Sequence, residues 1–176
     1  MNKEKLKKII KELYPYVVIV VVVVLFRTFI ATPVRVDGSS MDSTLKNGDI
    51  LILNKLDTEY ERFDVVVVNV KFDGKTSKLV KRVIGLPGES IEYKDNELYI
   101  NGEKLEDVAT ARTNDFSLKE LYNVDNIPDN YYFVMGDNRG YSRDSRDYTV
   151  GLIKKEDIVG TTTIRIFPFT KIGKFN

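Results

Sequence analysis

The chain has 176 residues, and its 27 lysines and arginines against 26 acidic residues give a formal net charge of +1. This balance argues against a nucleic-acid-binding protein, which usually carries a strong basic excess. The chain contains no cysteine and no histidine, which excludes disulfides, thiolate nucleophiles, Ser-His-Asp catalysis and cysteine- or histidine-based metal sites. Any acid–base chemistry therefore falls to Lys, Asp, Glu or Tyr, and we expect no cofactor and no metal.

The N-terminal 31 residues have the pattern of a membrane anchor. Five lysines within residues 1–12 precede an apolar segment at residues 13–31. As a helix this segment would be about 28 Å long, close to the ~30 Å hydrocarbon core of a bilayer. Arg27 lies one turn from its end and could reach the interface. The lysine cluster favours a cytoplasmic stretch at residues 1–12, a transmembrane helix at 13–31 and an extracellular region at 32–176.

Three other interpretations of this apolar segment fit its sequence less well. A buried strand would rarely run for ten apolar residues without alternation. A cleaved signal peptide needs small residues before the cut, and Phe29 disturbs the obvious site. A core helix would hardly begin directly behind five lysines. Spanning length and flanking charge therefore favour an uncleaved single-pass anchor in the cell membrane.

The rest of the chain has mostly β signals. Asp95-Asn96 and Asn101-Gly102 are typical of hairpin turns. We expect a mostly-β fold, a coiled, bulged and barrel-like antiparallel sheet, behind one N-terminal helix. Short segments rich in β-branched and aromatic residues predict strands at 34–36, 50–53, 64–70, 79–84, 90–93, 131–135 and 158–167.

Residues 106–130 differ from this pattern, because they are polar and irregular. Ser117, with Glu120 three residues later, predicts a capping box at the start of one short helix. We expect a small excursion from the β region at 32–176 and no second domain.

Two segments contain side chains that could take part in catalysis. One follows a short predicted strand, and the other lies within a strand. The hydroxyl-rich stretch at 38–45 contains Ser40, although serine and glycine in a loop often form only a turn. On the strand at 79–84, alternation places Lys81 on one face with Leu79 and Val83. Burial there could lower a lysine pKa by ~3–5 units and make the amine a base. The strand pattern alone favours the other interpretation, in which Lys81 extends from an edge strand into water.

A third segment, residues 136–146, alternates acids and arginines after an apolar strand. The pattern indicates a rigid, ion-paired turn. A surface loop whose salt bridges contribute under ~1 kcal/mol each would have the same sequence pattern.

Together these segments resemble the conserved boxes of type I signal peptidases. Residues 40–45 read Ser-Met-Asp-Ser-Thr-Leu and are similar to the family's Ser-Met-x-Pro-Thr-Leu. Residues 81–89 and 136–146 match the boxes Lys-Arg-Val-Ile-Gly-x-Pro-Gly-Glu and Gly-Asp-Asn-Arg-x-x-Ser-x-Asp-Ser-Arg throughout. One departure is Ser43, in place of the family proline, which we expect to loosen the loop by up to ~1 kcal/mol.

The resemblance implies a role for each matched residue. Ser40 would be the nucleophile and an oxyanion donor through its N–H, and Lys81 the general base. Ser142 would orient the Lys81 amine by a hydrogen bond, and Asp144 with Arg146 would form a structural ion pair. Gly38 lies where some members carry a hydroxyl donor, so the second oxyanion donor is left open.

The resemblance also implies the substrate, which would be the signal peptide of an exported preprotein with small residues at −1 and −3. It would bind as an added strand between residues 33–39 and 78–80. We expect Met41, Leu79 and Val80 to contact it. The lipid bilayer and the secretion machinery would be the other partners.

Three alternatives differ from this interpretation. A repressor-type (LexA-like) Ser-Lys autoprotease would carry a DNA-binding region in place of the anchor, and no helix-turn-helix pattern is present. A β-lactamase-like acyl enzyme needs a Ser-x-x-Lys motif on a helix, which is absent. A non-catalytic, membrane-tethered binding module would tolerate replacement of Ser40 and Lys81.

Overall fold

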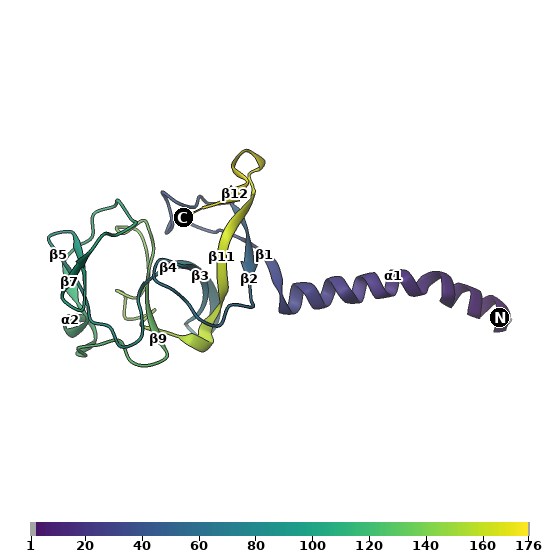
Figure 1. The fold of residues 1–176 in the computed structure, drawn as a ribbon, viewed down its shortest axis with the longest axis horizontal. Helices are drawn as coiled ribbons and strands as arrows, with labels where there is room; N and C mark the ends of the chain where they lie inside the picture. The colour runs from purple at the N-terminus through teal and green to yellow at the C-terminus, as the bar shows by residue number, and fades with distance from the viewer. Residues whose placement is uncertain (1–2, 176) are drawn as a thin grey trace.

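The computed structural model describes residues 3–175 and begins with a long helix that leaves the β region at one end (Figure 1). Helix α1 spans Lys3–Phe29, and its part Lys11–Phe29 is long and apolar enough to cross a bilayer. Its apolar side chains from Leu13 to Phe29 are exposed. The helix starts before the predicted segment at 13–31 and ends two residues earlier, because the chain enters a strand at Ala31. Residues 1–2 and 176, at the outer ends of the predicted segments, lie outside the described residues.

The main sheet has eight strands, and every pairing in it is antiparallel. Six of these strands confirm predicted segments. The strands predicted at 131–135 and 158–167 have the predicted bounds, and the ends of the other four are shifted. Register shifts in β11 and β4 are the expected bulges. Among residues 3–175 the sheet ends at β1 and β10, so it is not closed into a barrel. The sheet order is β1 (Ala31–Arg35), β2 (Ile50–Asn54), β11 (Ile158–Phe167), β3 (Val65–Phe72), β4 (Lys75–Gly85), β9 (Tyr131–Met135) and β10 (Ile153–Lys154), with β12 (Gly173–Lys174) paired to β11.

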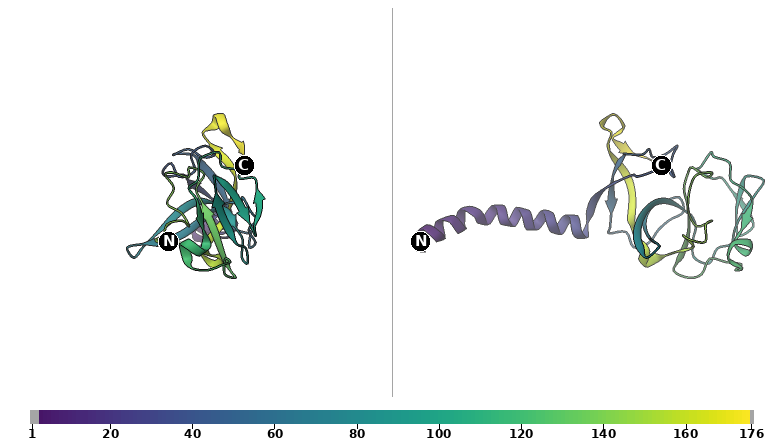
Figure 2. Two further views of the ribbon diagram at one scale, coloured as in Figure 1. Left: turned by 90° about the vertical axis from the view of Figure 1, so that its left-hand side faces the viewer. Right: turned by 180° about the vertical axis from the view of Figure 1, so that it is seen from behind.

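A second, four-stranded sheet lies at the far end from α1 (Figures 1 and 2). The turns predicted at Asp95-Asn96 and Asn101-Gly102 connect its strands, and all four residues have positive φ, as type I′ turns require. Buried side chains of β5 and β6 share one apolar cluster with Ile84 and Phe133 of the main sheet. The two sheets are therefore packed on a common core. The order is β7 (Glu103–Leu105), β6 (Glu97–Ile100), β5 (Ile91–Lys94) and β8 (Phe116–Ser117).

The polar stretch at 106–130 contributes to this core. It contains β8 and helix α2 (Leu118–Tyr122), and the predicted capping box is formed by Ser117 and Glu120. Its buried residues Phe116, Leu118 and Ile127 belong to the shared cluster. The excursion therefore covers the second sheet with a few apolar anchors. Two 3₁₀ turns complete the structure, η1 at Lys155–Asp157 and η2 at Phe169–Lys171.

Candidate active site

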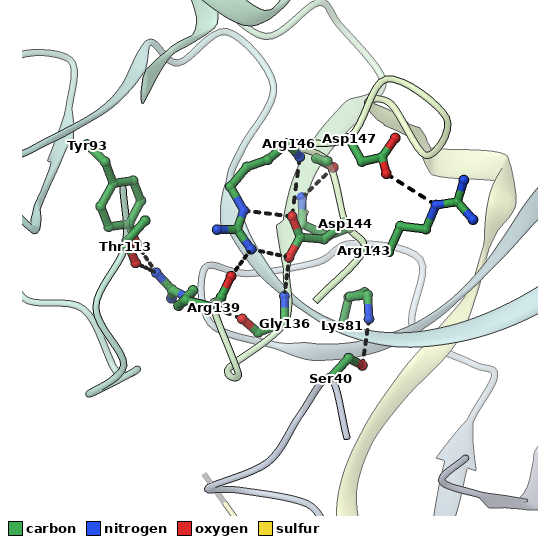
Figure 3. Close-up of polar contacts among 12 residues, drawn as sticks. Ser40, Lys81, Tyr93, Thr113, Gly136, Arg139, Arg143, Asp144, Arg146 and Asp147 are labelled. Atoms are coloured by element: carbon green, nitrogen blue, oxygen red, sulfur yellow. Dashed lines mark hydrogen bonds and ion pairs between the residues drawn. The ribbon is translucent and has the colours of Figure 1, made fainter. Parts of the chain in front are cut away.

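Ser40 and Lys81 meet although they lie 41 residues apart in the chain (Figure 3). Lys81 lies on β4, and Ser40 lies in the turn that follows β1. In that turn the N–H groups of Thr44 and Leu45 donate to the Met41 carbonyl, at 3.1 and 2.8 Å. The Lys81 Nζ to Ser40 Oγ distance is 2.7 Å, a direct hydrogen bond. The amine can therefore exchange a proton with the hydroxyl.

Lys81 is buried, with only 2 % of its surface exposed. Burial lowers the pKa of Lys81 from 10.5 to about 8, because the ammonium loses its hydration. The carboxylates of Asp144 and Asp137 act in the opposite direction, and the charge of Arg146 lowers the pKa further. At neutral pH this amine is therefore uncharged far more often than a surface lysine.

A cleft of about 210 Å³ opens beside Ser40. Leu79 and Val80, two of the residues expected to contact substrate, line this cleft. Met41 does not: it is 1 % exposed and packs in a cluster with Leu45 and Leu51 beneath the turn. The expectation for Met41 was therefore wrong in this structure, since its apolar side chain is directed into the core. The lining residues are Val34, Arg35, Val36, Asp37, Ser40, Val67, Lys78, Leu79 and Val80.

The loop after β9 supplies the predicted ion pair beside the site (Figure 3). The fully buried Asp144 accepts two hydrogen bonds from the Arg146 guanidinium, both at 2.9 Å. The same carboxylate accepts the Gly136 N–H at 2.9 Å. Arg146 also donates to the Arg139 carbonyl at 2.8 Å. This pair closes the loop upon itself, in the geometry expected for a rigid turn.

Ser142 lies in this loop but does not make the predicted hydrogen bond to Lys81. Its Oγ is buried and has no hydrogen-bond partner among the described residues. The Ser142 side chain lies beside Gly136 of the same loop. The expected orienting role of Ser142 is thus not realised in this structure, and the Lys81 amine is held by Ser40.

A second buried network, which the sequence patterns did not single out, connects the three motif segments. Arg82 and Asp137 are 3 % and 1 % exposed and form a two-point ion pair at 2.9 and 2.7 Å. Thr44, in the nucleophile turn, donates to the same Asp137 carboxylate at 2.6 Å. The Asn138 N–H donates to the Ser40 carbonyl at 3.0 Å. Thr44, Arg82 and Asp137 each lie within one of the three matched boxes at 40–45, 81–89 and 136–146, and this was the sequence signal that could have identified them.

Arg139 connects the loop to the second sheet and the excursion (Figure 3). It donates to the Tyr93 hydroxyl at 2.6 Å and to Thr113 Oγ1 at 3.0 Å, and it pairs with Asp107. The second sheet therefore helps to hold the loop that follows β9.

Gly136 lies where the loop presses on the nucleophile. A Cβ at this position would collide with Ser142 Oγ and with the Ser40 carbonyl oxygen. We therefore expect Gly136→Ala to displace Ser40 and lower kcat by at least about 100-fold, since ~1 Å of misplacement can cost that much. Steady-state kinetics on a peptide substrate would measure this. Gly140→Ala is the matched control, because a Cβ there meets no atom within 4 Å; equal activity of the two variants would contradict the expectation.

Gly38 and Ser43 both have positive φ, at +94° and +96°. The Gly38 N–H donates to Asn47 Oδ1 at 3.1 Å, so in this arrangement it is not directed to an oxyanion. A proline ring holds φ near −65° and could not adopt the Ser43 conformation. The effect of Ser43 therefore goes beyond loosening the loop, because the backbone conformation of the turn at this position excludes proline.

Comparisons with known proteins point to one family. The model of the family described as signal peptidase, peptidase S26, matches residues 8–167. Signal peptidase I S of Bacillus subtilis (strain 168) is 40% identical over 185 residues, covering 99% of this chain and 98% of the relative. Signal peptidase I of Bacillus caldolyticus is 38% identical and covers 98% of each chain.

A solved structure is similar as well. The crystal structure of a signal peptidase I from Enterococcus faecalis V583 is 34% identical, with a TM-score of 0.52, and the match covers 58% of this chain and 96% of that chain. The family model matches most of the chain, and the relatives are similar to it over nearly their full length. This chain is therefore a peptidase that belongs to the signal peptidase family S26.

Proposed function

We propose that the chain is a membrane-anchored endopeptidase that removes signal peptides from exported preproteins, using Ser40 and Lys81. The observation that carries the proposal is the 2.7 Å hydrogen bond between the Ser40 hydroxyl and a buried lysine whose pKa is lowered to about 8. The relatives named signal peptidase I support the choice of substrate.

The dyad can carry both halves of an acyl-transfer reaction. Neutral Lys81 takes the Ser40 proton while Oγ attacks the scissile carbonyl, and the Ser40 N–H stabilises the oxyanion. The Lys81 ammonium then gives its proton to the leaving amine, which leaves the signal peptide as an ester on Ser40. Lys81 next takes a proton from water, and the resulting hydroxide attacks the ester. Lys81 returns this proton to Ser40 Oγ as the bond breaks, and the signal peptide's carboxylic acid is released and loses its proton to solvent.

The cleft favours an extended peptide as substrate. Within the described residues, β1 pairs only with β2, and residues 78–80 of β4 pair only with β3. Both strands therefore present a free backbone edge to the cleft, so a substrate strand can add between them. The small volume of the cleft, about 210 Å³, suits the small residues at −1 and −3 that the resemblance implies.

Helix α1 would hold this cleft at the outer surface of the membrane. The lysines before the apolar segment support a cytoplasmic N-terminus and an extracellular region at 32–176. A preprotein reaches that surface by translocation, so the bilayer and the secretion machinery are proposed partners.

The proposal is tested with the full-length protein in lipid vesicles and a preprotein that has alanine at −1 and −3. Mass spectrometry should find a single new N-terminus after the −1 alanine, and Ser40→Ala should yield none. Cleavage by the Ser40→Ala protein would contradict the assignment, and the absence of cleavage by the unaltered protein would favour the binding-module alternative.

The pH dependence of cleavage should report the Lys81 amine. Because burial lowers its pKa to about 8, Lys81 is mainly ammonium below pH 8 and cannot accept the Ser40 proton. We expect kcat/KM to rise about tenfold per pH unit up to pH 7, and to level off above pH 8. Kinetics from pH 6 to 10 on an uncharged peptide would measure the profile. A rise that continues to pH 10 would mean that the amine is solvated.

A further inference from the structure

The membrane helix is joined to the catalytic region without a flexible linker (Figure 1). Helix α1 ends at Phe29 and β1 begins at Ala31, so a single residue, Ile30, lies between them. The Ile30 N–H still donates to the Phe26 carbonyl at 2.8 Å, which continues the helical hydrogen bonding to the junction.

Lys55 holds this junction. Its Nζ donates to the carbonyls of Arg27 and Thr28, at 3.0 and 3.1 Å, and its backbone N–H donates to the Ile30 carbonyl at 2.9 Å. The last carbonyls of a helix have no partner within the helix. Leaving them unpaired is costly near hydrocarbon, and an ammonium also complements the negative end of the helix dipole. One side chain therefore fixes the end of the anchor from outside the helix.

The strands around Lys55 lead directly to the cleft. Lys55 follows β2, whose last residue, Asn54, is paired with Ala31 at the start of β1. Further along β1, Val34 lines the cleft, about 13 Å from Ile30 at ~3.3 Å per residue. Lys55 itself is not among the residues that line the cleft. A change in the angle at the junction would therefore tilt the cleft relative to the bilayer without altering the dyad.

We propose that Lys55 is a positioning residue that sets the height and tilt of the cleft above the membrane. It would favour substrates whose signal peptide is embedded in the same bilayer. This inference rests on the proposed function. The role of Lys55 should affect two kinds of substrate differently. A peptide in solution reaches the cleft in any orientation, whereas an embedded preprotein presents its cleavage site at one height.

The test compares both substrates on the full-length protein in vesicles. The first is a preprotein embedded in the bilayer, and the second is a soluble peptide with the same cleavage site. We expect Lys55→Met to lower kcat/KM for the embedded preprotein at least about tenfold, because alignment is lost, while cleavage of the peptide stays within about twofold. Lys55→Arg should restore most of the activity, since a guanidinium can donate to both carbonyls.

Two further variants make the result specific. Inserting two glycines between Ile30 and Ala31 should produce the same difference between substrates with Lys55 intact. Lys104→Met, on an exposed lysine of β7 in the distal sheet, should change neither reaction. Equal losses on both substrates, or no loss on either, would overturn the role of Lys55. If the unaltered protein cleaves neither substrate, the proposed function itself fails, and this inference fails with it.

Discussion

Replacing Lys81 with methionine should abolish cleavage and at the same time make the protein more stable. Methionine has no proton acceptor, so the Ser40 hydroxyl would have to attack without a base. Loss of a nucleophile or base in a serine hydrolase typically costs ~10⁴-fold or more in kcat. We expect activity on a signal-peptide substrate to fall below detection.

The gain in stability follows from the lowered pKa of Lys81. Since the folded pKa of about 8 is below the unfolded value of 10.5, the folded state binds the proton less tightly than the unfolded state. At pH 7 this lowered pKa opposes folding by ~3 kcal/mol. The cost is fully present below pH 8 and disappears as the pH rises towards 10.5. A methionine of similar shape would remove the cost without leaving a cavity.

Urea unfolding at pH 7 and pH 10.5 would measure this effect. Lys81→Met should gain up to ~3 kcal/mol over the unaltered protein at pH 7, and the two should converge at pH 10.5. Ser40→Ala is the matched control, because it should lose the same activity while keeping the buried amine and its cost. A Lys81→Met protein that is no more stable at pH 7 would show that the amine is not desolvated.

The parts of the fold that follow local rules were predictable from the sequence. Residues 131–135 and 158–167 are apolar or β-branched runs between turn signals, and both formed strands at the predicted bounds. Asp95-Asn96 and Asn101-Gly102 can adopt positive φ, and Ser117 with Glu120 forms a cap through neighbouring atoms. Each of these features is decided within a few residues.

Features that depend on distant partners were not predictable in this way. The division into two sheets places β4 beside β9 and β5 beside β8, which no local pattern specifies. Met41 was expected at the cleft, but its side chain packs with Leu51 and Val65 in the core. Ser142 was expected at the Lys81 amine, but its side chain lies beside Gly136 of its own loop. The resemblance identified Ser40 and Lys81, but the strand pattern did not predict that Lys81 is buried, and this required the three-dimensional structure.

Breaking the Arg82–Asp137 pair should cause the largest loss of stability. Asp137→Ala would leave the Arg82 guanidinium buried without its carboxylate, and Thr44 would lose its acceptor. Removal of one partner of a buried ion pair costs ~3–5 kcal/mol, because the remaining charge is desolvated and unpaired. Urea unfolding would measure the loss. The matched control is Lys104→Ala, which removes an exposed pair with Glu97 and should cost far less, because solvent screens that pair.

The double variant Arg82→Met, Asp137→Leu separates the structural role of this network from its effect on catalysis. Removing both charges together avoids an unpaired buried charge, so most of the lost stability should return. Thr44 would still have no carboxylate to hold the nucleophile turn, so we expect kcat to stay about tenfold below that of the unaltered protein, with KM little changed. A double variant with full kcat would show that the turn does not depend on Asp137, whereas one as unstable as Asp137→Ala would show that the buried charges themselves favour the fold.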